Sequence, residues 1–197
     1  MKNLTSPTVL LALICAGSAF AQAQRSPAAA QGQQRPAAAA AAPAPGGVSQ
    51  PDNTTATYGD WTHRCQQGVG TRICEVVQTL QVQGQQGPVA LVAVGRPVKT
   101  EPYKLVVQVA PNVTLGPNAG VRVALGEKDE GTLAAYSRCI PGGCFAEVSM
   151  SEDMLKRWRG YSEGGQLRFQ DAANRPVILP FSFRGFQAAA DALAREP

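Results

Sequence analysis

The sequence predicts an all-β fold, mainly an antiparallel β-sandwich, with one short internal helix, a C-terminal helix and disulfide staples. Three observations favour this class. Short apolar runs separated by turn residues recur from residue 58 onward, a pattern typical of sandwiches and barrels. Four cysteines beyond residue 60 fall into two local pairs, and the chain opens with the pattern of an export signal, which predicts an oxidising destination for them.

The first 21 residues have the features of a secretory signal peptide. Lys2 precedes the apolar run "TVLLALICAGSAFA", which closes in Ala19-Phe20-Ala21. A basic start, a short apolar core and an A-x-A site distinguish such a signal from a membrane anchor. We therefore expect cleavage after Ala21, loss of Cys15 with the signal, no transmembrane span in the mature chain, and a periplasmic or secreted, outer-envelope-associated location.

Residues 22–57 are rich in Ala, Gln and Pro and nearly devoid of large apolar side chains. Such a composition cannot offset the entropy of ordering, so it predicts a disordered tether. The remaining residues, 58–197, are enough for one domain with a substantial core. Within them 15 Lys and Arg face 13 Asp and Glu without a basic block, so nucleic acid is not an expected partner.

Nine strands are expected in this domain, and the first has a clear alternation. In "YGDWTHRC", Trp61, His63 and Cys65 share one face, expected to point inward, while Asp60, Thr62 and Arg64 share the other. The run "VALVAVG" is apolar at every position, which places it in the middle of the fold. The expected strands are 58–65, 72–82, 88–95, 104–110, 120–125, 131–138, 144–149, 165–171 and 176–183.

Two helices are expected among the strands. In "SEDMLKRWRG", Ser151 is a suitable N-cap, acidic residues follow it, basic residues come last, and Gly160 can end the helix. Met154, Leu155 and Trp158 form its apolar side. In the tail "FQAAADALARE", Phe186, Ala190 and Leu193 recur at helical spacing and are expected to pack across a sheet edge or an open end of the sandwich.

The cysteines favour disulfides over metal binding. Four cysteines allow three connectivities, but their spacing favours Cys65 with Cys74 and Cys139 with Cys144, the second pair flanking the turn "IPGG". A zinc site would be expected to use C-x2-C-like pairs of free thiolates, and a thioredoxin-like pair would need C-x-x-C. No metal and no cofactor is therefore expected.

Only a weak catalytic candidate exists. His63, the sole histidine, and Asp60 could act as base and acid, and Asp60 and Glu75 could pair as carboxylates. No motif supplies a nucleophile with an orienting partner, since G-x-S-x-G, H-E-x-x-H and the glycine-rich phosphate loops are all missing from the sequence. We expect His63 to be a partly packed strand residue and the protein not to be an enzyme.

The order of several motifs resembles the invasion-associated locus B family of exported bacterial proteins. These motifs are "YGDW", the cysteine pair that follows it, "CIPGGC", and the ending "PVILPFSFRGF". The resemblance spans residues 58 to about 193 and implies a periplasmic or envelope-associated β-rich domain without known enzymatic activity. The family is named for a member linked to entry into host erythrocytes, yet it is widespread in non-pathogens. Only the disulfide cysteines, Cys65, Cys74, Cys139 and Cys144, carry over.

The leading functional hypothesis is a non-enzymatic envelope module that binds another macromolecule, a protein or an envelope component, with a host-cell link as one form of it. The loops "PNVTLGPNAG" at 111–120 and "QGQQG" at 83–87 are the natural contact sites, because loops on rigid scaffolds often carry function. Two alternatives are a periplasmic hydrolase and a small-ligand carrier, each using a site near His63 and Asp60. The sequence leaves the oligomeric state open.

Overall fold

The computed structural model describes residues 51–196, which form ten strands and two helices. The predicted signal peptide at 1–21 and most of the predicted tether lie outside these residues. The elements are β1 (Asn53–Tyr58), β2 (Trp61–Gln67), β3 (Arg72–Leu80), β4 (Ala90–Arg96), β5 (Lys104–Val109), β6 (Gly120–Ala124), β7 (Thr132–Ile140), β8 (Gly143–Ser149), α1 (Glu152–Arg159), β9 (Gly164–Gln170), β10 (Pro176–Ser182) and α2 (Phe186–Arg195).

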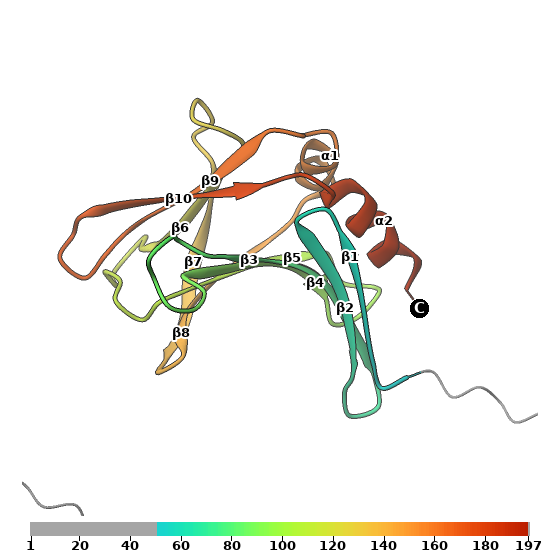
Figure 1. The fold of residues 1–197 in the computed structure, drawn as a ribbon. Coiled ribbons are helices and arrows are strands. Elements are labelled where there is room, and N and C mark those ends of the chain that lie inside the picture. The colour runs from blue at the N-terminus through green and yellow to red at the C-terminus, as the bar shows by residue number, and fades with distance from the viewer. Residues whose placement is uncertain (1–50, 197) are drawn as a thin grey trace, which may run out of the picture. The chain divides into compact units, whose positions relative to one another are not determined.

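All ten strands belong to one antiparallel sheet in the order β1-β2-β3-β4-β5-β8-β7-β6-β9-β10. The all-β, antiparallel prediction is confirmed. The layers arise because this one sheet folds over, so that β9 and β10 lie opposite the β3–β5 part (Figure 1). The long strand β3 contacts the end of β10 directly, through paired hydrogen bonds between Gln78 and the backbone of Ser182.

The N-terminal boundary differs from the prediction. Residues 53–57, expected to end the tether, form β1, and the strand expected at 58–65 is instead the turn of a hairpin plus most of β2. Tyr58 pairs with Trp61 across a two-residue turn that starts with Gly59 at a φ of +58°. Positive φ at that position suits glycine in a tight hairpin. The sequence of β1 is polar because this edge strand is largely exposed, so it lacks an apolar alternation.

The inner face of the sheet carries the core. Trp61, His63 and Cys65 are all buried, as the alternation in β2 predicts. The apolar strand β4 lies between β3 and β5, also as predicted, with Val92 and Val94 fully buried. Where β10 runs into α2, the aromatic side chains meet edge-on or tilted; they are Trp61, Trp158, Phe181, Phe183 and Phe186.

Both helices cover this aromatic cluster. Helix α1 begins after Ser151, whose hydroxyl accepts a hydrogen bond from the Met154 amide, and it buries Trp158. Helix α2 packs against β1, β2 and β3 and against α1, with Phe186, Ala190 and Leu193 buried. The predicted capping, apolar sides and edge packing are thus confirmed. Within residues 51–196, neither helix has the length and apolarity needed to cross a membrane.

Candidate functional site

Two disulfides fasten neighbouring strands. Cys65 and Cys74 lie directly opposite each other on β2 and β3, and Cys139 and Cys144 do the same on β7 and β8. The first disulfide is buried, whereas Cys139 is exposed at the β7–β8 turn. Each closes a short loop, of nine and five residues in separation, and on the chain-entropy model contributes about 2–3 kcal/mol.

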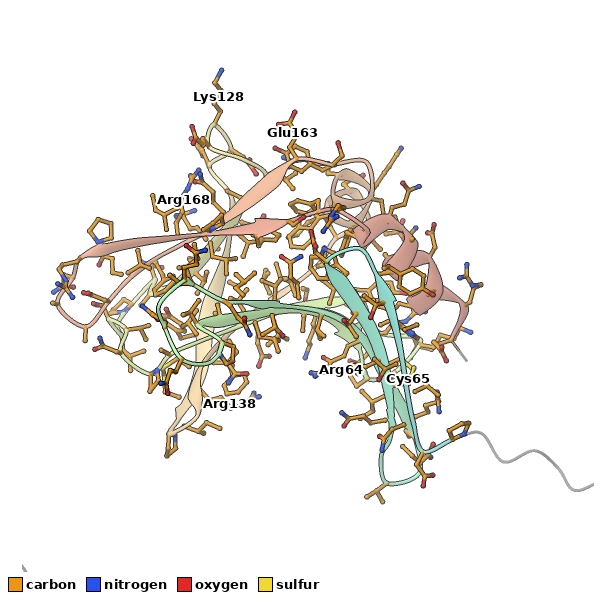
Figure 2. The ribbon with its side chains drawn as sticks, in the orientation of Figure 1. Arg64, Cys65, Lys128, Arg138, Glu163 and Arg168 are labelled. Carbon is orange, nitrogen blue, oxygen red and sulfur yellow. A yellow bond between two sulfur atoms is a disulfide. The ribbon has the colours of Figure 1, made fainter. Side chains whose placement is uncertain are left out.

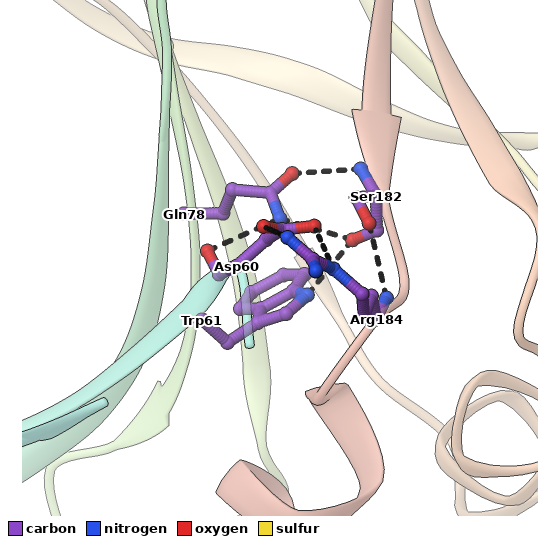
Figure 3. A network of polar contacts seen from close by, with 5 residues as sticks. All are labelled: Asp60, Trp61, Gln78, Ser182 and Arg184. Atoms are coloured by element: carbon purple, nitrogen blue, oxygen red, sulfur yellow. Dashed lines mark hydrogen bonds and ion pairs between the residues drawn. The ribbon is translucent and has the colours of Figure 1, made fainter. Parts of the chain in front are cut away.

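Asp60 belongs to a polar network that joins the β1–β2 turn to the end of β10. Its carboxylate accepts two hydrogen bonds from the Arg184 guanidinium, and the Asp60 amide donates to the Arg184 carbonyl (Figure 3). The Trp61 indole donates to the Ser182 carbonyl at 2.8 Å. We call Asp60, Trp61, Gln78, Ser182 and Arg184 the clasp, because they hold β10 against β2 and β3.

The hydrogen bond from Arg184 is the main reason that the pKa of Asp60 lies below its ordinary value, and a bond with Ser182 adds to the effect. Asp60 is therefore ionised at neutral pH and engaged with a guanidinium. A carboxylate held in this way is a poor general acid, since it has no proton to donate. Asp60 holds the β1–β2 turn to the segment that follows β10.

His63 faces a different carboxylate, Glu196, at the end of α2. Its Nε2 lies 3.6 Å from Glu196 Oε1 and 3.6 Å from Cys65 Sγ, and only 6% of the residue is exposed. Burial lowers the pKa of His63, and the Glu196 charge opposes that effect. Arg72 also faces Glu196, at 3.7 Å. A shallow depression of about 520 Å³ lies over this group.

The predicted pairs of catalytic residues are not brought together. Asp60 contacts Arg184, His63 contacts Glu196, and Glu75 bonds Arg64 with a nitrogen–oxygen distance of 2.6 Å. The ring nitrogen of His63 that meets the Glu196 carboxylate also faces the Cys65 sulfur. The arrangement fits the predicted packed strand histidine.

The loop at 111–120 borders a cavity of about 500 Å³. Val113 bridges Asp171, the Thr114 amide donates to the Gln170 carbonyl, and the Tyr136 amide donates to the Ala119 carbonyl. These bonds fix both ends of the loop to β7 and β9. The residues lining the cavity are Thr114–Gly120, Arg122, Leu133, Arg168, Phe169 and Gln170.

Strand register continues this surface across four strands. Leu133 on β7 pairs with Arg122 on β6, Arg122 pairs with Arg168 on β9, and Arg168 pairs with Ile178 on β10. Directly paired residues share a face of the sheet. We call Leu133, Arg122, Arg168 and Ile178, together with Leu115 of the loop, the arginine row; Leu115 is 59% and Ile178 57% exposed.

The two arginines of the row differ in their bonding. Arg168 lies at the base of the loop that carries Lys128 (Figure 2). Among residues 51–196 it donates only to neutral acceptors, which are the carbonyls of Gly126, Glu127 and Asp129 and the side-chain oxygen of Gln166. No ion pair with another described residue therefore cancels its charge, and the exposed Arg122 adds a second positive charge beside it. The row can bind an anionic group together with apolar side chains.

Sequence reasoning identified the loop but missed the arginines. Arg122 and Arg168 occupy polar positions of alternating strands, which are ordinary solvent-facing positions in a sequence. Only the pairing of β6 with β9, more than forty residues apart in the chain, brings them together. The other predicted contact loop, at 83–87, is exposed in the β3–β4 connection.

The sheet, the two disulfides and the clasp define an all-β domain whose aromatic cluster is covered by two helices. The family model described as Invasion associated locus B (IalB) protein matches residues 61–194, so the chain belongs to this family. Invasion protein B homologues of Brucella abortus, strain 2308 and biovar 1 strain 9-941, are each 28% identical over 150 residues, spanning 76% of this chain and 83% of theirs.

The solved structure of invasion associated protein B from Bartonella henselae superposes with a TM-score of 0.60 at 20% identity, covering 71% of this chain and 95% of that chain. This similarity shows a shared fold. Together, the family and the two disulfides point to an exported envelope protein.

Proposed function

We propose that this protein is a non-enzymatic binding module of the bacterial envelope, which recognises an acidic segment of a partner protein through the arginine row. The main support for this proposal is that Arg122 and Arg168 lie side by side at a cavity. The loop 111–120 that borders the cavity is hydrogen-bonded to the sheet at both of its ends. A loop that is already held in place loses little conformational entropy when a partner binds, and this favours binding at the loop 111–120.

The chemistry of the row favours such a partner. The exposed Arg122 guanidinium can pair with a carboxylate through two parallel hydrogen bonds. Arg168 adds a fixed positive charge beside it, because four of its five donors already bond protein oxygens. Leu115 and Ile178 offer exposed apolar contacts in the same row as the charges. Burial of apolar side chains around a charged pair is common at protein interfaces. Involvement of a host-cell component is one form of this proposal, in line with the names of the relatives.

Photo-crosslinking in the bacterium that makes the protein tests the proposal. A photoreactive p-benzoylphenylalanine replaces Leu115 in one strain and Val69, a fully exposed residue of the β2–β3 turn, in another. We expect a discrete protein adduct from position 115 only, and its loss when Arg122→Glu is added. Lys104→Glu, which reverses an exposed charge on β5, should leave the adduct intact.

Three outcomes would overturn the proposal. These are no adduct specific to position 115, an adduct that persists in Arg122→Glu, or an adduct to an anionic glycan in place of a protein. Exchange of Arg122 for Glu should not disturb folding, because the side chain is exposed. Unchanged unfolding by urea checks this point.

A further inference from the structure

Four potential metal ligands converge at the buried disulfide between β2 and β3. They are His63, Cys65, Cys74 and Glu196, and one ligand atom of each lies within 4.8 Å of all the others. Among residues 51–196 this is the one such group of histidine, cysteine and carboxylate side chains. In the oxidised protein the two sulfurs are bonded to each other, so they are not thiolate ligands.

We propose that reduction of the Cys65–Cys74 disulfide converts this group into a tetrahedral zinc site with two sulfur, one nitrogen and one oxygen ligand. Zinc binds each of these three ligand types and is almost always four-coordinate in structural sites. Zn–S bonds of about 2.3 Å and Zn–N or Zn–O bonds of about 2.1 Å place tetrahedral ligand atoms roughly 3.3–3.8 Å apart. His63 Nε2 already lies 3.6 Å from both Cys65 Sγ and Glu196 Oε1.

The backbone already presents the four ligands to one point. Cys65 and Cys74 are in direct register on neighbouring strands, so both sulfurs lie on the same face. His63 is two residues before Cys65 and shares that face. Glu196 follows the last turn of α2, which packs over these strands. The depression over His63, Arg72 and Glu196 provides a route for the ion from solvent.

The charges also suit zinc. Two thiolates, one carboxylate and a neutral imidazole give the zinc-bound group a net charge of −1. Arg72, whose Nε lies 3.7 Å from Glu196 Oε2, can neutralise it. This Nε is buried and has no hydrogen-bond partner within the described residues. An outer-shell group that hydrogen-bonds a ligating carboxylate and orients it is typical of metal sites.

The chemical balance is simple. A dithiol donates two electrons and two protons, the Sγ–Sγ bond breaks, two thiols form, and the dithiol becomes a disulfide. Zn²⁺ then displaces both thiol protons to solvent. The second disulfide is the internal control, because Cys139 and Cys144 have no histidine or carboxylate ligand grouped with them in the described part of the chain.

Cobalt binding to the full chain in a Cys15→Ser background tests the proposal. After reduction by a phosphine, Co²⁺ should bind once per chain with the thiolate charge-transfer and visible bands of a tetrahedral site, and Zn²⁺ should displace it. The oxidised chain and Cys65→Ser/Cys74→Ser should lack these bands, whereas Cys139→Ser/Cys144→Ser should retain them. His63→Gln and Glu196→Gln should each weaken Co²⁺ binding by about 100-fold or more, and Arg72→Gln by about tenfold.

Equal affinity in His63→Gln, or bands that survive Cys65→Ser/Cys74→Ser, would overturn the proposal. Reduction can also unfold the chain, and tryptophan fluorescence of the metal-free protein detects this. In that event Zn²⁺ should restore the native fluorescence of the parent chain but not of His63→Gln. Failure of zinc to restore it in the parent would equally overturn the site.

Discussion

At the scale of single residues, the clasp shows how a few polar contacts hold distant segments together. Asp60 and Arg184 are 124 residues apart, yet they meet in a two-pronged ion pair beside the Trp61 indole. Exposed ion pairs add little to the free energy of unfolding, whereas each hydrogen bond from a buried group such as Gln78 or Trp61 adds about 1 kcal/mol. The indole and amide contacts therefore dominate, and Asp60 adds a pH-dependent part.

Replacing Asp60 by Asn should make stability less sensitive to acid. Because its pKa is lower in the folded protein than the ordinary 3.8, Asp60 stabilises the fold above that pH, and this contribution disappears as pH falls through the folded value. Urea unfolding from pH 7 to pH 3 should show a constant difference between the parent and Asp60→Asn above about pH 5, which shrinks below about pH 4. A difference that grows on acidification would contradict the role assigned to Arg184.

Gly185 is expected to be intolerant of a side chain. A Cβ there would lie 1.9 Å from the Tyr58 carbonyl oxygen, and its φ is +90°. Gly185→Ala should lower the free energy of unfolding by about 3 kcal/mol. Gly142→Ala, which would meet no atom within 4 Å, should change it by less than about 0.5 kcal/mol in the same urea titration. Equal losses in the two variants would be inconsistent with the close approach of Gly185 to Tyr58.

The sequence predicts the burial of single residues in the candidate site but not their contacts. The alternation of "YGDWTHRC" correctly predicts that Trp61, His63 and Cys65 are buried, because period-two patterns report directly on strand faces. The partners of Asp60 and His63 were not predicted, since Arg184 and Glu196 lie more than 120 residues further along the chain. Contacts at such separations depend on topology, which local pattern does not encode.

At the scale of elements, the predictable parts are those with strong local signals. Helix α1 has a capping serine and a charge gradient, and it begins and ends as predicted. Strand β1 is not predicted by the sequence pattern, because an exposed edge strand carries no apolar alternation. Gly59 lies in a tight turn at a position where the pattern predicts strand. The pairing of β6 with β9, which builds the arginine row, follows from the folding-over of the sheet rather than from either strand.

Helix α2 should depend on one side chain for its attachment. Phe186 is fully buried and its ring lies 4.8 Å from that of Trp61 and 5.4 Å from that of Trp158. Phe186→Ala should cost about 3–5 kcal/mol in urea unfolding, from lost burial and a cavity. Gln187→Ala, exposed on the same helix, is the control and should have almost no effect. Similar losses for both would contradict the packing of α2 on β2.

At the scale of the whole molecule, we expect the sheet, the two helices and the clasp to unfold as one cooperative unit. The first and last strands are held together through β2, β10 and α2, so neither end should unfold alone. Both tryptophans lie in the aromatic cluster, whereas the far-ultraviolet signal reports the whole sheet. We expect coincident thermal transitions by tryptophan fluorescence and circular dichroism. A fluorescence transition several degrees earlier would show that the α1–α2 end separates first.

Both the disulfides and an envelope partner require the protein to act outside the cytoplasm. The direct measurement treats intact, osmotically shocked and fully lysed cells with protease and with a thiol-trapping reagent. We expect digestion of the domain before the cytoplasmic membrane is opened, with all four cysteines of the domain oxidised. Digestion of intact cells would favour a surface partner, and digestion only after shock a periplasmic one. Protection of the domain until full lysis, with free thiols, would contradict a location outside the cytoplasm.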